Sequence, residues 1–188
     1  MKIGFALTGS FCTFARIFPV MEALSRNYEL IPIVSEAVAA TGSRFGTAAG
    51  HRAKITELCG KPPLDSIPAV EPIGPKKLLD VLIVAPCTGN TLAKLSLGIA
   101  DTPVTMAVKS HLRNGRPVLI AVSTNDALGT AAENIGRLLA RKHFYFVPFS
   151  QDAPDGKPCS CVAHFEQIPD ALEAALQNRQ LQPLLLQN

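Results

Sequence analysis

The sequence predicts a single α/β domain in which a mostly parallel sheet lies between two layers of helices. Short apolar runs alternate with helical patterns along all 188 residues, an alternation typical of parallel strands joined by crossover helices. The runs at 79–85 and 117–122 are almost entirely apolar, as expected of strands covered on both faces. A chain of this length can bury a complete core by itself.

The first half begins with an apolar strand at 2–8, which ends before Gly9-Ser10. Residues 11–26 carry apolar side chains every three to four positions and predict a helix, with a kink or late start at Pro19. A second strand is expected at 28–35, and a helix at 47–59 that is closed by Gly60. The proline-rich stretch 61–75 is expected to cross the surface.

The second half continues the same rhythm. Strands are predicted at 79–85, 117–122 and 144–149, and helices at 91–100, 103–113, 127–142 and 170–179. Residues 151–161 are expected to form a polar loop. We therefore expect one domain over 1–188, in which a C-terminal helix and tail occupy about 165–188.

Composition excludes several classes of protein. The net charge is +3, tryptophan is absent, and no basic cluster alternates with aromatic residues, so nucleic acid is not an expected partner. No stretch approaches the about 18 apolar residues of a membrane span, and no signal peptide is evident, so we expect a cytoplasmic protein. The five cysteines lack zinc-site or thioredoxin spacing. We expect reduced thiols and no metal.

A ligand site is expected where the predicted parallel strands end, because such sheets bind ligands beyond the carboxyl ends of their strands. Glycine, hydroxyl and amide side chains gather there in three loops. Gly9 and Ser10 follow the first strand, 86–91 follows the central strand, and 123–125 follows the next. Ser35 ends the second strand. The simpler interpretation of Ser10 and Ser35 is that each only caps a helix.

The loop P86-C87-T88-G89-N90-T91 is the strongest local signal. Pro86 ends the strand without needing a backbone donor, and Gly89 allows close approach of a ligand. Asn90 offers both a donor and an acceptor, while Thr88 and Thr91 add hydroxyls at the start of a helix. An elaborate helix cap is the alternative.

Two further features favour a small-molecule site. Ser123, Thr124 and Asn125 repeat the pattern of the preceding loop, and two such loops at one crevice make a ligand site more probable than one. Arg44, between glycines, could hold a carboxylate bidentately or could be a solvated loop residue; Lys109 and Arg113 are weaker candidates. None of the four histidines has a partner at catalytic or metal spacing, so no catalytic residue is identified.

The 86–91 loop resembles the signature of the homo-oligomeric flavin-containing Cys decarboxylases, which reads P-A-S-A-N-T and is followed by a lysine and G-x-x-D. Matching positions include Pro86, Asn90 and Thr91, and then Lys94, Gly98 and Asp101. The resemblance implies a three-layer, flavodoxin-like or Rossmann-like domain that binds FMN and assembles as a trimer or higher homo-oligomer.

The resemblance also assigns roles to individual residues. It implies that Gly9, Ser10 and Ser35 hold the phosphate and ribityl chain. Pro86, Thr88, Gly89, Asn90 and Thr91 would approach the flavin ring and phosphate. The ring and substrate would be bordered by Ser123, Thr124 and Asn125.

Longer stretches resemble one subfamily: I3-G-F-A-L-T-G-S10, R44-F-G46, S123-T-N-D-A-L-G129 and the tail around L181-Q-P183. Its members are one half of a sporulation enzyme that converts a small diacid into an aromatic dicarboxylate, with loss of water and two electrons. The other half of the enzyme would bring NADP, Arg44 would bind a substrate carboxylate, and the compartment would be the mother-cell cytoplasm.

Departures from the decarboxylase pattern disfavour two other reactions. The P-x-M-N-x-x-M-W clamp for a cysteine substrate reads V122-S-T-N-D-A-L-G129 here, and the chain has no tryptophan. The first loop reads TGSFC in place of the G-A-S-G type of flavin prenyltransferases. An FMN-dependent decarboxylase-like flavoprotein and a non-catalytic scaffold subunit remain as alternatives.

Overall fold

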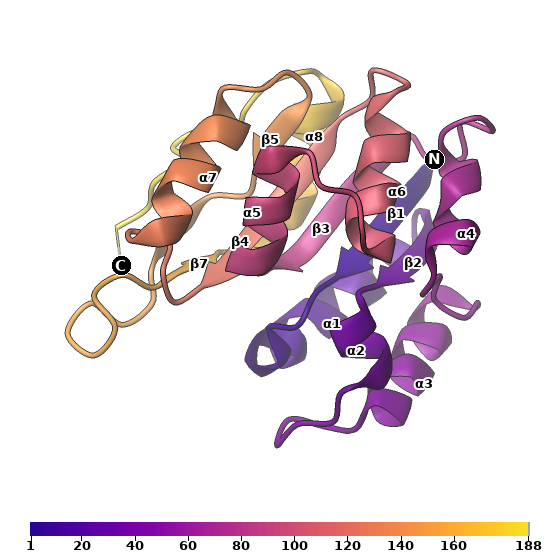
Figure 1. Ribbon diagram of the computed structural model, residues 1–188, viewed down its shortest axis with the longest axis horizontal. Helices are drawn as coiled ribbons and strands as arrows, with labels where there is room; N and C mark the ends of the chain where they lie inside the picture. Colours follow the sequence, from indigo (N-terminus) through magenta and orange to yellow (C-terminus); the bar gives the residue numbers. More distant parts are fainter. Residues whose placement is uncertain (188) are drawn as a thin grey trace.

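The computed structural model describes residues 1–187, which fold into three layers around a central sheet (Figure 1). Five parallel strands lie in the order β2 (Glu29–Val34), β1 (Lys2–Leu7), β3 (Val81–Cys87), β4 (Val118–Thr124) and β5 (Phe144–Phe146). Strand order reverses between β1 and β3, which is the flavodoxin-like arrangement. The predicted α/β/α fold is confirmed.

Two short antiparallel strands extend this sheet: β6 (Phe149–Gln151) and β7 (Cys161–Ala163). The β7 strand pairs with the carboxyl end of β4 through Ser123↔Val162 and Thr124↔Cys161. The predictions of one strand at 144–149 and of a loop throughout 151–161 were therefore wrong in part. Pro148 cannot donate to a ladder and separates β5 from β6, and strands of three residues are too short to show a period.

Four helices cover one face of the sheet: α4 (Ile67–Val70), α5 (Gly89–Leu97), α6 (Pro103–Leu112) and α7 (Thr130–Leu139). The other face carries α1 (Phe14–Ser25), α3 (Ala48–Cys59) and α8 (Ile168–Leu176). In Figure 1, α5, α6 and α7 lie in front of the sheet and α8 lies behind it. Short connecting turns of helix are α2 (Glu36–Ala40), η1 (Phe11–Thr13), η2 (Glu71–Ile73) and η3 (Phe165–Gln167).

Most helix predictions are right in type and differ at the ends. The helix predicted at 11–26 begins with η1, and α1 keeps Pro19 inside it. The helix predicted at 127–142 begins later, because Gly129 N–H and Ala131 N–H both donate to Asp126 O and close a turn first. The crossing at 61–75 contains α4 and η2, which the sequence did not predict. No helix within 1–187 is long and apolar enough to cross a membrane.

One buried titratable group lies between the sheet and α6. His111 is 0% exposed, and its Nε2 lies 3.0 Å from Pro117 O. Desolvation lowers the pKa of His111 to about 4, although the bond to Pro117 O opposes this shift. The ring is therefore neutral at pH 7, with Nε2–H donating to the carbonyl.

This burial predicts a pH-dependent stability. In the unfolded chain the imidazole pKa is about 6.5, so the unfolded state binds more protons as the pH falls below that value. The free energy of unfolding should fall by about 1–2 kcal/mol between pH 7.5 and 5. Urea unfolding measures it. His111→Gln, which keeps a donor for Pro117 O, should reduce this slope and leave the part that the lowered pKa of His51 contributes. An unchanged slope in His111→Gln would contradict the assignment.

Candidate functional site

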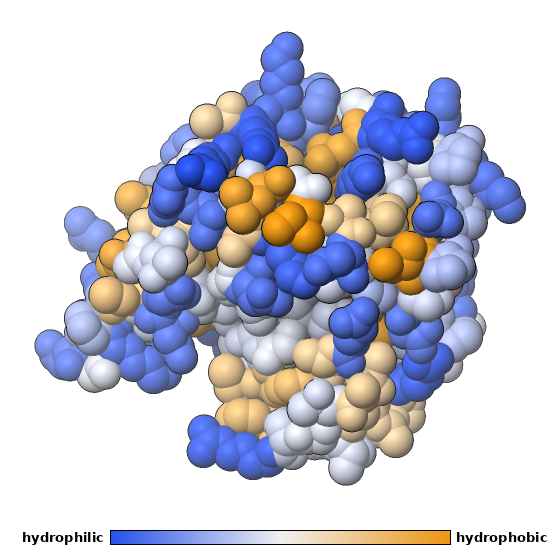
Figure 2. Space-filling model, in the orientation of Figure 1, coloured by the Kyte–Doolittle hydropathy of each residue, from blue (hydrophilic) through white to orange (hydrophobic). Residues whose placement is uncertain are grey.

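A cleft of about 630 Å³ lies beyond the carboxyl ends of β1, β3 and β4. In Figure 2 the molecule is hollowed at the lower left, between the segments 41–47 and 152–158 that Figure 1 shows as two protruding loops. Most of the residues predicted for the site line this cleft: Gly9, Ser10, Arg44, Thr88, Gly89, Ser123, Thr124 and Asn125. The strand-end loops are thus brought together as the sequence predicted.

The remaining predicted residues lie outside the cleft lining. Ser35 caps α2 by accepting a hydrogen bond from Val38 N–H at 3.4 Å. Pro86 is buried within β3, and Thr91 is buried behind Thr88. Asn90 is exposed on the first turn of α5. Any contact of these four with a ligand depends on how that ligand extends beyond the cleft.

The ends of β1 and β3 are joined by the hydroxyl of Thr8, which the sequence analysis did not select. Thr8 is 1% exposed. Its Oγ1 donates to Pro86 O at 2.7 Å and accepts from Thr88 N–H at 3.0 Å. One side chain therefore fixes the loop after β3 relative to the loop after β1.

A second hydroxyl pair joins the loop after β1 to the end of β4. Ser10 Oγ and Ser123 Oγ lie 2.8 Å apart and share a hydrogen bond across the cleft wall. The Ser10 side chain makes no capping bond to the helix that follows it. The interpretation of Ser10 as a helix cap is therefore wrong, and its hydroxyl belongs to the cleft.

Gly89 allows two loops to pack closely together. A Cβ at this position would lie 2.7 Å from Thr124 Oγ1 and 2.9 Å from Asp126 Oδ1. The Thr124 hydroxyl in turn donates to the Asp126 carboxylate. Gly89 thus lines the cleft and also leaves room for the neighbouring loop, and its approach by a ligand stays a prediction.

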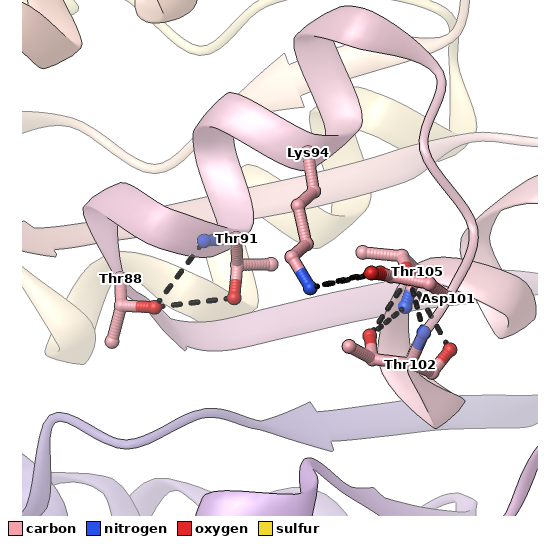
Figure 3. A network of polar contacts seen from close by, with 6 residues as sticks. All are labelled: Thr88, Thr91, Lys94, Asp101, Thr102 and Thr105. Atoms are coloured by element: carbon pink, nitrogen blue, oxygen red, sulfur yellow. Dashed lines mark hydrogen bonds and ion pairs between the residues drawn. The ribbon is translucent and has the colours of Figure 1, made fainter.

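The residues of the decarboxylase-like signature have two kinds of role in the structure (Figure 3). Some line the cleft, and others connect α5 to α6. Thr88 both lines the cleft and caps α5 by accepting from Thr91 N–H at 3.4 Å. One turn later, Lys94 Nζ reaches Asp101 Oδ1 at 2.8 Å, next to the capping box of Thr102 and Thr105 that begins α6. Lys94 and Asp101 therefore hold α5 to α6.

Three cationic side chains line the cleft. Arg16 pairs with Glu166 at 3.5 Å, and Lys157 pairs with Asp152 at 3.8 Å. Arg44 forms no ion pair within residues 1–187, and its guanidinium carbon lies 4.8 Å from the centroid of the Phe45 ring. Sequence reasoning missed Arg16, Asp152 and Lys157. The charged character of the 152–157 segment was a signal for the last two, and Q151-D152 also belongs to the stretches that resemble the subfamily.

The other titratable candidates lie elsewhere. Lys109 and Arg113 border a different cavity between α5 and α6, which removes them as carboxylate ligands in the cleft. No histidine of the described chain lines the cleft. Residues 1–187 contain no group of three or more His, Cys, Asp or Glu side chains able to hold a metal ion. All five cysteines are free thiols.

Comparison with known proteins decides the family. The family described as Flavoprotein matches residues 1–178. The chain belongs to the Flavoprotein family. It is 46% identical to the B subunit of dipicolinate synthase from Bacillus subtilis (strain 168), over 100% of this chain and 94% of that protein.

Two solved structures resemble the chain as well. The B subunit of dipicolinate synthase from Bacillus halodurans C is 44% identical, with a TM-score of 0.91 over 100% of this chain and 96% of that one. A dodecameric FMN-dependent UbiX-like decarboxylase from Escherichia coli O157:H7 is 25% identical, with a TM-score of 0.61 over 79% and 80% of the two chains.

One departure from the decarboxylase signature is explained by burial. Cys87, where that signature has alanine, is 0% exposed. Desolvation raises the pKa of the Cys87 thiol well above its usual range, so it stays neutral. It packs as a small apolar side chain.

The two hydrogen bonds of the Thr8 hydroxyl should contribute to the stability of the fold. Thr8→Val keeps the shape of the side chain but leaves Thr88 N–H without its acceptor and Pro86 O without one donor. The free energy of unfolding should fall by about 1–3 kcal/mol, measured by urea denaturation. Thr8→Ser restores the hydroxyl and should recover most of that loss. A larger loss in Thr8→Ser than in Thr8→Val would mean that packing of the methyl group, and not hydrogen bonding, sets the stability here.

Proposed function

We propose that this protein acts as the B subunit of a two-subunit dipicolinate synthase, with FMN and a small diacid bound at the cleft. The observation that carries the proposal is Arg44, a cation that lines the cleft and forms no ion pair within 1–187. The reaction proposed is conversion of 4-hydroxy-tetrahydrodipicolinate to dipicolinate, by loss of water and two electrons. Full-length similarity to named B subunits supports this choice.

The chemistry of the cleft fits FMN. Its volume of about 630 Å³ is within the range of small-molecule sites, about 300–1,000 Å³. Ser10, Thr88 and Ser123 offer hydroxyls, and the loops lie at the switch point where flavodoxin-like folds bind this cofactor. When bound, a flavin would supply a two-electron acceptor. Gly9, Ser10 and Ser35 would hold the phosphate and ribityl chain.

The rest of the signature would approach the flavin from its other side. Thr88, Asn90 and Thr91 would lie near the ring and phosphate, and Ser123 to Asn125 would border the ring. Of these, Asn90 is the least supported, because it is exposed on α5 and outside the cleft lining.

The diacid would be held by charge. A guanidinium binds a carboxylate through two parallel hydrogen bonds, and Arg44 has no competing carboxylate partner within 1–187. Arg16 and Lys157 add positive charge to the same cleft but already have acidic partners. Arg44 is therefore assigned the substrate carboxylate, and the other two raise the local potential for a doubly charged ligand.

Asp152 is proposed as the proton-transfer group. It is the carboxylate among the described residues that line the cleft. Ser160, 1% exposed, donates a hydrogen bond to its Oδ1. A carboxylate held in this way can take a proton from carbon and, once protonated, deliver it to the leaving hydroxyl, which departs as water in the dehydration.

The partners follow from the same proposal. The A subunit of dipicolinate synthase would supply NADP, and expression would belong to the mother cell during sporulation. Homo-oligomerisation, as a trimer or larger, is proposed from an apolar patch over α5, where Leu97 is 59% and Ile99 42% exposed (Figure 2). The dodecameric relative assembles from a similar fold.

A scaffold protein without catalysis is the second candidate. The observation that favours it is the bond between Thr124 and Asp126 above Gly89, because these loop groups satisfy one another and not a ligand. Full synthase activity of the A subunit without this protein would select this alternative. A decarboxylase acting alone would release carbon dioxide from a cysteinyl substrate in the presence of FMN.

The flavin assignment predicts tight binding of FMN, followed by the change in flavin fluorescence during titration. Ser10→Ala and Ser123→Ala each remove one hydroxyl of the cleft and should weaken binding about two- to tenfold, the effect of one hydrogen bond. Ser25→Ala is the matched control, because that hydroxyl bonds Glu22 O on α1. No binding at saturating FMN would leave NADP, held by the other half of the synthase, as the sole electron acceptor.

The substrate assignment predicts distinct kinetic effects in the enzyme reconstituted with NADP and the A subunit, followed by the ultraviolet absorbance of dipicolinate. Arg44→Gln should raise KM about tenfold or more, since a charge-assisted bond contributes about 1.5–3 kcal/mol. Asp152→Asn should lower kcat about 100-fold. Arg26→Gln, a surface control, should change neither. Wild-type kinetics in Arg44→Gln would remove this residue from the site, and failure of the complete system to form dipicolinate would overturn the function.

A further inference from the structure

A second cavity, of about 350 Å³, lies beside the cleft, between α1 and α3. We call it the aromatic chamber. Four phenylalanine rings and one imidazole form most of its wall: Phe11, Phe14, Phe18, Phe45 and His51. Nothing in the proposed reaction has used these side chains.

The chamber wall is built from rings in fixed mutual contact. His51 stacks on Phe11, with ring centroids 5.6 Å apart and an interplanar angle of 15°. Phe14 meets the same imidazole edge-on at 4.9 Å. His51 is 5% exposed, its Nε2 has no hydrogen-bond partner within 1–187, and desolvation lowers the pKa of its ring. The wall is therefore aromatic and uncharged at neutral pH.

The chamber and the cleft share a border. Phe11, Cys12 and Phe45 line both cavities. Arg44 lines only the cleft, directly beside Phe45. A molecule at this border would meet aromatic rings on one side and a guanidinium on the other.

Pyridine-2,6-dicarboxylate has the matching asymmetry. Both of its carboxylates and the ring nitrogen lie on one edge, and the opposite edge carries only C–H groups. Aromatic rings attract one another in offset or edge-to-face arrangements beyond the effect of buried area, and the guanidinium suits a carboxylate. The non-aromatic precursor has the same charges but a puckered ring.

We infer that the aromatic chamber is a subsite for the C–H edge of a planar aromatic 2,6-dicarboxylate, the carboxylates of which face Arg44. The identity of the ligand rests on the proposed function, while the subsite is separate from the flavin position. Such a subsite would let the protein distinguish an aromatic ring from a saturated one. The protein binds the flat aromatic product more tightly than a saturated ring of equal charge.

The test is calorimetric titration of the full chain in buffer free of divalent cations. Pyridine-2,6-dicarboxylate should bind about tenfold more tightly than cis-cyclohexane-1,3-dicarboxylate, a saturated ring with the same two carboxylates and no basic nitrogen. It should also bind more tightly than pyridine-2,5-dicarboxylate, which would place a carboxylate among the rings. Equal affinity for the three compounds would overturn the inference.

A matched pair of variants tests the location. Ala15 is an exposed residue of α1 that lines the chamber but not the cleft. Ala15→Leu should fill the chamber and weaken pyridine-2,6-dicarboxylate at least about tenfold. Ala23→Leu, at another exposed alanine of α1, should have no effect.

The titration of each variant is repeated with FMN, whose affinity should not change, so failure of the subsite and failure of the flavin site are distinguished. Unchanged affinity of Ala15→Leu for the dicarboxylate would overturn the inference. Competition between FMN and the dicarboxylate would do the same, because it would place the ring in the cleft.

Discussion

The hydroxyl of Thr8 is the interaction on which the geometry of the site depends. Parallel strands are held together by their backbone ladders, but the loops beyond them are not. Thr8 continues the ladder by one residue through its side chain, with bonds of 2.7 and 3.0 Å to the β3 end. Ser10 and Ser123 then connect the same loop to β4. Without these bonds, the three loops would share an edge of the sheet but not a fixed cleft.

The sequence predicted the parts of the fold that burial dictates. The nearly continuous apolar runs of β3 and β4 could only be strands covered on both sides, and the rule that ligands bind beyond parallel strand ends selected the loops around Gly9, Thr88 and Ser123. The sequence analysis did not select residues whose role depends on how neighbouring strands are aligned in the sheet. Thr8 and Pro86 are 78 positions apart in sequence, and no local pattern indicates that a threonine hydroxyl will bridge them.

Helix geometry accounts for the other differences between prediction and structure. A turn of helix sends successive side chains in different directions, so Thr88 faces the cleft while Asn90 faces solvent, although both belong to one signature. The same geometry brings Arg16 to the cleft from the first turn of α1. Capping and ligand binding are also compatible roles, since Thr88 uses its oxygen to cap α5 at the border of the cleft. For Thr88, capping a helix and lining a ligand site are therefore not exclusive alternatives.

Two departures from the decarboxylase pattern, at positions 89 and 124, meet in the structure. Glycine at 89 leaves room for Thr124, since a Cβ would approach its hydroxyl to 2.7 Å, and the same hydroxyl is bonded to Asp126. An alanine at 89, as in the decarboxylase signature, would therefore displace the Thr124 side chain or its loop. The residues at 89 and 124 are therefore coupled by close packing in this chain. Because Thr124 borders the cleft and Ser123 is bonded to Ser10, this pair of residues shapes the cleft wall without involving the Thr8 bridge.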